Sequence, residues 1–220
     1  MAKILDGKET ARKIREELKA RCAILKEKGV VPGLAVVLVG NDPASAIYVG
    51  QKEKACAEVG FKSFRHELLA DAAEPELFAL VDRLNGDPSV HGILVQLPLP
   101  KGLSADRTIE RIDPCKDVDG FHPLNAGLLA CGLPGGVPCT PKGVMRLLRD
   151  HGIPLEGKKA VVVGRSNIVG KPMAQLLLAA NMTVTVCHSR TPDLAAETLQ
   201  ADVLVVAAGK PGIVDGSMVK

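Results

Sequence analysis

Residues 158–172 read Lys158-Lys159-Ala160-Val161-Val162-Val163-Gly164-Arg165-Ser166-Asn167-Ile168-Val169-Gly170-Lys171-Pro172. Its run of small and β-branched apolar residues, closed by glycine, predicts a buried parallel strand. A tight turn follows, and residues 173–180 predict a helix, so the amide groups of the helix can point at a phosphate. The spacing departs from the G-x-G-x-x-G fingerprint of dinucleotide sites, because Ser166 and Val169 stand where glycines would. An ordinary strand-to-helix turn is the alternative.

The residues that follow support a nucleotide-binding interpretation. Residues 183–187 predict a second strand, residues 193–200 a helix, and residues 201–209 a third strand that ends in small residues. This β-α-β-α-β order is one mononucleotide-binding half of a doubly wound sheet.

The tip of the second strand indicates which dinucleotide binds. An NAD site usually has an acid about 20 residues after the first turn, where it holds the ribose 2′-hydroxyl. Here the strand ends in His188, Ser189 and Arg190. A guanidinium binds phosphate in a bidentate way, and Arg165 in the first turn adds a second cation. The tip therefore favours NADP over NAD.

Composition limits the protein class. The chain has 220 residues, 46% of them hydrophobic and 24% charged, which is typical of a soluble globular enzyme with room for two small domains. Aromatic residues make up only 2%, so the core must be aliphatic, and a net charge of +3 without basic runs gives no support for nucleic-acid binding. Six cysteines without a C-x-x-C pair, and no signal-like or membrane-length apolar run, predict a cytoplasmic protein.

The first half of the chain carries a second group of candidate residues. Residues 34–39 predict a strand, after which Asp42 can cap a helix that continues to residue 59. Tyr48 and Lys52 lie four residues apart and share one face of this helix. A solvated helix face is the alternative interpretation. Gln96 directly follows a third strand at residues 91–95, so we expect Lys52 and Gln96 to point into one crevice.

The middle of the chain is rich in turns. Residues 111–122 contain three acids, too few and wrongly spaced for a calcium loop, so we expect no metal there. Thr140 is predicted to cap a helix, with Pro141 in its first turn. We place the domain boundary between residues 120 and 140.

Five motifs resemble the bifunctional methylenetetrahydrofolate dehydrogenase/methenyltetrahydrofolate cyclohydrolase family. They are SAIYVGQK at 45–52, GILVQLPLP at 92–100, PCKDVDGF at 114–121, PCTPKG at 138–143 and GRSNIVGKP at 164–172. They occur in the family's order along nearly the whole chain. The resemblance implies an α/β fold of two domains: a folate-binding α/β domain with linker at residues 1–130, and a Rossmann-like NADP-binding domain at residues 131–220.

The resemblance also implies the site residues. The catalytic residues would be Lys52, Tyr48, Gln96 and Asp119. The folate substrate would be bound by Tyr48, Gln96, Leu97, Pro98 and Asp119. NADP would be bound by Thr140, Gly164, Arg165, Ser166, Ile168, Val169, His188, Ser189, Arg190 and Gly209.

The same resemblance implies NADP-dependent oxidation of 5,10-methylenetetrahydrofolate, hydrolysis of the product to 10-formyltetrahydrofolate, and a homodimer formed through the second domain. Family members continue beyond the position of Lys220 with a further strand, a proline- and glycine-rich loop and a helix, so we expect the second domain to be incomplete relative to the family. A monofunctional dehydrogenase of the same fold, and a form that binds ligand without turnover, are the alternatives.

Overall fold

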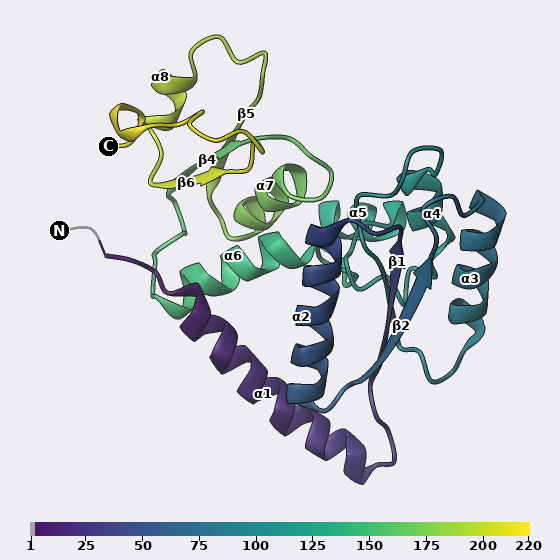
Figure 1. The fold of residues 1–220 in the computed structure, drawn as a ribbon. Coiled ribbons are helices and arrows are strands. Elements are labelled where there is room, and N and C mark those ends of the chain that lie inside the picture. The colour runs from purple at the N-terminus through teal and green to yellow at the C-terminus, as the bar shows by residue number, and fades with distance from the viewer. Residues whose placement is uncertain (1–2) are drawn as a thin grey trace. The chain divides into compact units, whose positions relative to one another are not determined.

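The computed structural model describes residues 3–220, which divide into two compact units (Figure 1). One unit comprises residues 6–123. The other comprises residues 124–220 together with the described residues 3–5. Each unit is built around its own three-stranded parallel sheet, in agreement with the predicted α/β fold of two domains.

The first unit alternates helices and strands. Its elements are α1 (Gly7–Glu27), β1 (Gly33–Val39), α2 (Pro43–Val59), β2 (Lys62–Leu68), α3 (Glu74–Gly86), β3 (Gly92–Val95) and α4 (Ala105–Arg111). The strands are ordered β2-β1-β3 and all are parallel. The carboxyl ends of the three strands therefore lie along one edge of the sheet.

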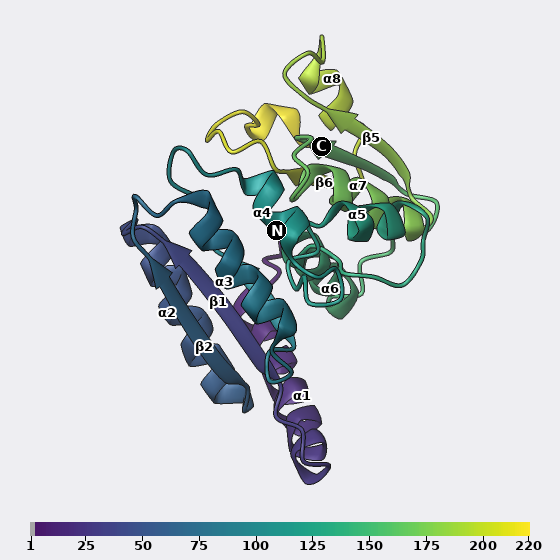
Figure 2. The ribbon, with the colours of Figure 1, turned by 90° about the vertical axis from the view of Figure 1, so that its right-hand side faces the viewer.

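The central strand β1 is buried on both of its faces. Its alternate residues Ala35, Val37 and Val39 pack with α3, whereas Val36 and Leu38 pack with Val49 of α2. Figure 2 shows the sheet with α2 on one side and α3 on the other. A strand that is covered on both faces reads as a continuous apolar run, which is why residues 34–39 were recognisable from sequence.

Local capping sets the ends of α2. Asp42 accepts a hydrogen bond from the Ser45 backbone N–H at 2.7 Å, and Pro43 is the first helical residue, as predicted. Gly60 ends the helix in the left-handed region at φ 88°, where a side chain would be strained. The Asp42 cap determines where α2 begins after β1, and the Gly60 cap determines where it ends.

The second unit repeats the same arrangement. Its elements are α5 (Pro123–Ala130), α6 (Cys139–Asp150), β4 (Lys159–Val163), α7 (Gly170–Ala179), β5 (Thr183–Cys187), α8 (Leu194–Thr198), β6 (Val203–Val206) and the 3-10 helix η1 (Gly216–Met218). The strand order is β5-β4-β6, again all parallel. Ala160 and Val162 of β4 pack with α6 and α7, and Val161 and Val163 pack on the opposite face.

Two local predictions need correction. Residues 105–111 form helix α4, which we did not predict; Ser104 caps it by accepting a hydrogen bond from the Arg107 N–H at 3.3 Å. Thr140 does not cap α6. That helix begins one residue earlier, at Cys139, with Pro138 as its N-cap and no side-chain cap bond, so Thr140 lies inside the first turn.

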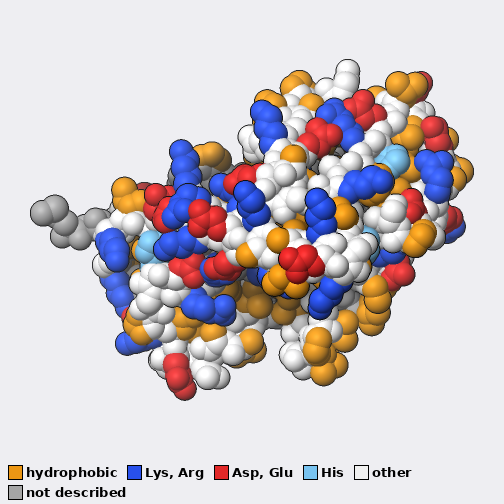
Figure 3. Space-filling view, turned by 90° about the horizontal axis from the view of Figure 1, so that it is seen from below, with side chains coloured by type: hydrophobic (Ala, Val, Ile, Leu, Met, Phe, Trp, Pro, Cys, Tyr) orange, Lys and Arg blue, Asp and Glu red, His pale blue; other side chains and the backbone are white. Residues whose placement is uncertain are grey.

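The surface and the helices give two further observations. Figure 3 shows one face of the molecule, on which Lys and Arg side chains lie among Asp and Glu side chains instead of gathering into one basic patch. Among residues 3–220, no helix combines the length and the apolar character needed to cross a membrane.

Candidate active site

Lys52 and Gln96 meet at the carboxyl edge of the first sheet. Lys52 lies on α2, which follows β1, and Gln96 directly follows β3. The Lys52 ammonium Nζ donates a hydrogen bond of 2.7 Å to Gln96 Oε1. Both side chains are half-buried. Parallel strand order therefore brings together two residues that lie 44 positions apart in the sequence.

The amide of Gln96 is held in one orientation. Its Nε2 donates a hydrogen bond of 2.7 Å to the carbonyl oxygen of Leu97, so its Oε1 is left facing Lys52. Leu97 is half-buried and the following Pro98 is exposed. Tyr48 lies one turn before Lys52 on α2 and its side chain is 58% exposed, which leaves the ring open to a flat ligand.

Asp119 lies on a loop whose backbone is held by the side chain of Asp117. The buried carboxylate of Asp117 accepts hydrogen bonds from the backbone N–H groups of Gly120 at 3.0 Å and of His122 at 2.9 Å. Asp117 also pairs through its backbone with Ile93 of β3. The loop that carries Asp119 is thereby attached to the strand that leads into Gln96.

The surroundings of Asp119 change its protonation. Burial raises the pKa of Asp119 to about 6 from an ordinary value of 3.8. The Lys52 ammonium opposes this increase and the Asp117 carboxylate adds to it. A half-buried acid and a half-buried amine thus interact at one edge of the sheet, an arrangement that suits proton transfer and recognition of a polar ring.

This raised pKa predicts how stability depends on pH. The folded protein binds the Asp119 proton more tightly than the unfolded chain, so the stability that this proton contributes is present below pH ~4 and is lost as the pH rises through about 6. We expect Asp119→Asn to raise the free energy of unfolding at pH 8 by about 1–3 kcal/mol, and to leave it nearly unchanged at pH ~4. Urea denaturation at several pH values measures this. The exposed variant Asp71→Asn should show no such pH dependence, and an equal effect of Asp119→Asn at all pH values would contradict the assignment.

The second group of predicted residues gathers at the carboxyl edge of the other sheet. Strands β4, β5 and β6 end at Val163, Cys187 and Val206. The Gly164 N–H donates to the Cys187 carbonyl at 2.8 Å, and the Ala207 N–H donates to the Val163 carbonyl at 2.7 Å. The segments that carry the following predicted residues therefore leave the sheet side by side: Gly164, Arg165, Ser166, Ile168, Val169, His188, Ser189, Arg190 and Gly209.

Two glycines make the first turn possible. A Cβ at Gly164, where φ is 122°, would lie 2.4 Å from the Ala207 carbonyl oxygen, and a Cβ at Gly170 would lie 2.2 Å from the Gly164 carbonyl oxygen. Both positions need the close backbone approach that glycines supply in dinucleotide sites, although the spacing differs from the usual fingerprint.

Ser166 closes this turn on itself. Its Oγ accepts hydrogen bonds from the Val169 N–H at 3.2 Å and from the Gly170 N–H at 3.3 Å. The backbone amides of Val169 and Gly170, at the start of α7, are therefore bonded within the turn, whereas the Arg165 side chain is exposed. Arg165 and the exposed Lys171 are the cationic side chains of this turn.

The tip after β5 is a tight turn that presents Ser189 and Arg190 to solvent. The His188 N–H donates to the Thr191 hydroxyl at 2.9 Å, and the Arg190 N–H donates to His188 Nδ1 at 3.1 Å. The histidine is thus used to shape the turn, while the side chains of Ser189 and Arg190 are exposed. A hydroxyl-bearing residue three positions after His188 was a signal for this turn that our sequence reasoning did not use.

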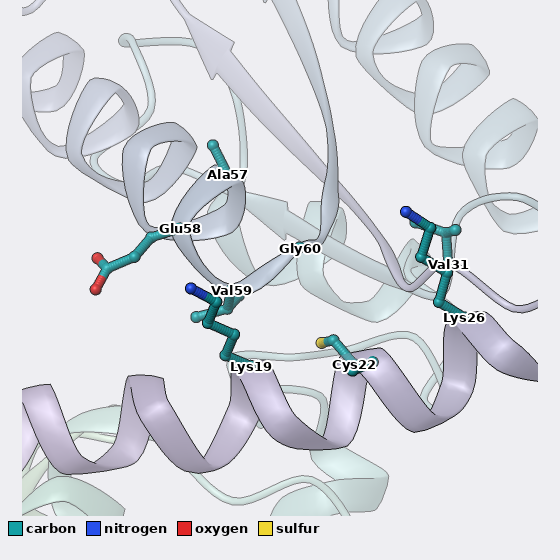
Figure 4. A pocket seen from close by; sticks show the side chains of 9 residues that line it. Lys19, Cys22, Lys26, Val31, Ala57, Glu58, Val59 and Gly60 are labelled. Carbon is teal, nitrogen blue, oxygen red and sulfur yellow. The ribbon is translucent and has the colours of Figure 1, made fainter.

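A hollow of about 390 Å³ lies at the opposite edge of the first sheet (Figure 4). Val31 precedes β1 and Gly60 precedes β2, so this hollow is at the amino ends of the strands. Ligands of open α/β sheets bind beyond the carboxyl ends, and this hollow holds none of the predicted site residues. It is lined by Lys19, Cys22, Ala23, Lys26, Val31, Ala57, Glu58, Val59 and Gly60.

Comparison with known proteins gives consistent results for both units. The family model for the tetrahydrofolate dehydrogenase/cyclohydrolase catalytic domain matches residues 5–119, and the model for the NAD(P)-binding domain of the same family matches residues 138–220. The chain is 58% identical to the bifunctional protein FolD of Bordetella petrii over 219 residues, which cover 100% of this chain and 74% of that protein. It is 56% identical to the protein of the same name from Acetivibrio thermocellus, and the match covers 100% of this chain and 77% of that protein.

Solved structures also resemble the chain over nearly its whole length. The bifunctional enzyme FolD, methylenetetrahydrofolate dehydrogenase/cyclohydrolase, of Campylobacter jejuni matches with a TM-score of 0.97 and 53% identity, covering 99% of this chain and 78% of that one. The Trypanosoma brucei methylenetetrahydrofolate dehydrogenase-cyclohydrolase, solved with NADP cofactor and an inhibitor, matches with a TM-score of 0.95 and 41% identity, covering 100% and 76%.

Proposed function

Since the chain belongs to the tetrahydrofolate dehydrogenase/cyclohydrolase family, we propose that it oxidises 5,10-methylenetetrahydrofolate with NADP⁺ and hydrolyses the resulting 5,10-methenyl compound to 10-formyltetrahydrofolate. The observation that carries this proposal is the hydrogen bond between Lys52 and Gln96, beside Asp119, at the carboxyl edge of the sheet in residues 6–123. We assign folate binding to that unit and cofactor binding to residues 124–220.

The oxidation needs two ligands held in the correct geometry. NADP⁺, when bound, accepts the hydride from the methylene carbon of the folate, and the folate is left as a methenyl cation. No proton moves at that carbon, so the contribution of the protein is to bind and orient. Asp119 would accept hydrogen bonds from the pterin amino group and ring N–H, and Tyr48 would stack on the flat rings. Leu97 and Pro98 would complete the folate-binding surface.

The hydrolysis needs proton transfer. Water adds to the methenyl carbon and loses a proton, which gives a neutral carbinolamine. One carbon–nitrogen bond of the ring then breaks as the hydroxyl loses its proton to form the formyl C=O and the leaving nitrogen gains a proton, so one proton is released overall. The amine of Lys52 is placed to take the proton from water and to give a proton to the leaving nitrogen. Gln96 orients the amine through the observed hydrogen bond.

NADP would be held at the other sheet edge. Arg165 and Arg190 are exposed beside the strand ends and would hold the 2′-phosphate together with Ser166 and Ser189. Gly164, Ile168, Val169, His188 and Gly209 would shape the surface against the rest of the dinucleotide, with Thr140 near the nicotinamide.

A paired assay tests the proposed function. Purified protein should form NADPH from NADP⁺ and 5,10-methylenetetrahydrofolate, and should accelerate the loss of 5,10-methenyltetrahydrofolate absorbance. Oxidation without accelerated hydrolysis would identify a monofunctional dehydrogenase. Ligand binding, seen as a thermal shift, without either reaction would identify a non-catalytic form.

We also propose a homodimer formed through the second unit. Strand β5 is an outer strand of the described sheet, and Val186 on β5 and Leu178 on the neighbouring α7 are 39% and 64% exposed. A lysine at Val186 should therefore break the dimer, whereas Val206→Lys on the outer strand β6 should leave it intact. Light scattering of the 23.1 kDa chain measures both. A monomeric parent protein, or loss of the dimer in the β6 variant alone, would contradict this interface.

We place the protein in the cytoplasm. Among residues 3–220 the six cysteines form no disulfide, and Cys115, Cys131 and Cys139 are exposed. Exposed thiols persist in a reducing compartment.

A further inference from the structure

Lys116 links the loop that carries Asp119 to the end of a helix. Its ammonium Nζ donates hydrogen bonds to three backbone carbonyl oxygens at the C-terminal end of α3: those of Leu84 at 3.2 Å, Asn85 at 2.7 Å and Asp87 at 2.9 Å. An ammonium has three protons, and here each has an acceptor. These acceptors lie at the negative end of the helix dipole, where a cation is stabilised.

The backbone of Lys116 is held as firmly as its side chain. Its carbonyl oxygen accepts a hydrogen bond from the Ile93 N–H of β3 at 2.7 Å, and its N–H donates to the Asp113 carbonyl at 2.7 Å. The residue is therefore attached to helix α3 through its side chain and to the outer strand β3 through its main chain.

Asp119 lies three residues further on, inside the turn that Asp117 closes. The Asp117 carboxylate accepts hydrogen bonds from the backbone N–H groups of Gly120 and His122, which follow Asp119 in the chain. Val118 packs against Gly92: a Cβ added at Gly92 would lie 2.3 Å from Cγ1 of Val118. Residues 113–122 thus form one loop that these bonds hold together, and the ammonium of Lys116 is one of its attachments to the end of α3.

We propose that Lys116 is a positioning residue for the folate reaction: by binding the last carbonyls of α3 it sets where the carboxylate of Asp119 stands relative to Lys52. This inference rests on the proposed function for the role of Asp119 in folate binding. Lys116 itself contacts carbonyl groups of the scaffold and is assigned no contact with substrate.

The test is Lys116→Met, which keeps the length of the side chain and removes the ammonium. A displaced loop opens Asp119 to water, so the midpoint of its titration, followed by NMR of the labelled carboxyl carbon, should fall from about 6 towards 3.8. Lys52 and Asp117 are the charged groups that face Asp119, and both remain. We expect kcat/KM for the folate substrate to fall about 10- to 100-fold, largely through KM, because small displacements are costly at a reacting site.

Three further variants make the result interpretable. Lys116→Arg retains donors for the same carbonyls and should recover part of the loss. Asn85→Ala removes a second attachment of the loop, the 2.9 Å bond that the Asp113 N–H donates to Asn85 Oδ1. It should act in the same direction with a smaller effect, and it takes the place of Lys116→Met if that variant does not fold. Arg111→Met removes an exposed ion pair between α4 and α3, from Arg111 to Asp82 at 2.6 Å. It should change neither the titration midpoint of Asp119 nor the KM for the folate substrate.

Affinity for NADP⁺, measured without folate, should be equal in all variants. A folded Lys116→Met protein that keeps the Asp119 midpoint near 6 and the parent KM would overturn the inference. If Asp119→Asn leaves the folate KM unchanged while Lys116→Met still shifts the Asp119 midpoint, the positioning is correct and the proposed role of Asp119 in folate binding is wrong.

Discussion

Lys52→Met is expected to lose about 10²–10⁴-fold in hydrolysis of 5,10-methenyltetrahydrofolate, the range of effect for a positioned proton-transfer group, while measurable NADP⁺-dependent oxidation remains. Methionine keeps the stem length and apolar bulk but removes the amine that bonds Gln96. Hydride transfer moves no proton at the methylene carbon, so the two activities should separate at this residue. Both are measured on one preparation, with the oxidation followed as NADPH and the hydrolysis as loss of methenyl absorbance.

Lys54→Met is the matched control for Lys52→Met. Lys54 lies on the same helix, is exposed, and is one position off the face that Tyr48 and Lys52 share. It should affect neither activity strongly. Hydrolysis at the parent rate in Lys52→Met would show that Lys52 is an ordinary surface lysine. Loss of both activities in a folded Lys52→Met protein would make Lys52 a substrate-positioning residue instead of the base.

Arg190→Ala should weaken NADP⁺ binding by about 1.5–3 kcal/mol, roughly 10- to 150-fold, with little effect on NAD⁺. The turn after β5 presents Ser189 and Arg190 to solvent. Arg190 and Arg165 are the two predicted cations for a 2′-phosphate. Titration calorimetry with both cofactors measures the difference. The 2′-phosphate assignment fails if the two cofactors lose equal affinity.

The exposed Arg149, at the end of α6 in the same unit, provides the control for Arg190→Ala. Arg149→Ala removes the same charge from the unit without touching the sheet edge, so both cofactors should bind as they do to the parent. A loss of NADP⁺ affinity in this variant would show that net charge, and not the contact at the tip, decides the preference.

The amino-acid sequence by itself determined the two parallel sheets and most of the order of the elements around them. Strands β1 and β4 are covered on both faces, so their buried residues 35–39 and 160–163 are all apolar, and such runs can be seen without coordinates. Asp42 followed by Pro43 set the start of α2 for local reasons of capping. Five ordered motifs were sufficient to indicate the family, because each is short and contiguous.

Only the tertiary structure decided which polar groups bond to one another. Lys52 reaches Gln96 across 44 residues because β1 and β3 are neighbours in the sheet, and strand order is a non-local property. For the same reason the carbonyls of α3 that hold Lys116 could not be assigned from residues 111–122 alone. The sequence shows these residues only as rich in turns, whereas the structure buries Asp117. At the first turn of the second unit the sequence shows a serine where a glycine is usual, but only the packed backbone shows that Ser166 bonds the amides of Val169 and Gly170.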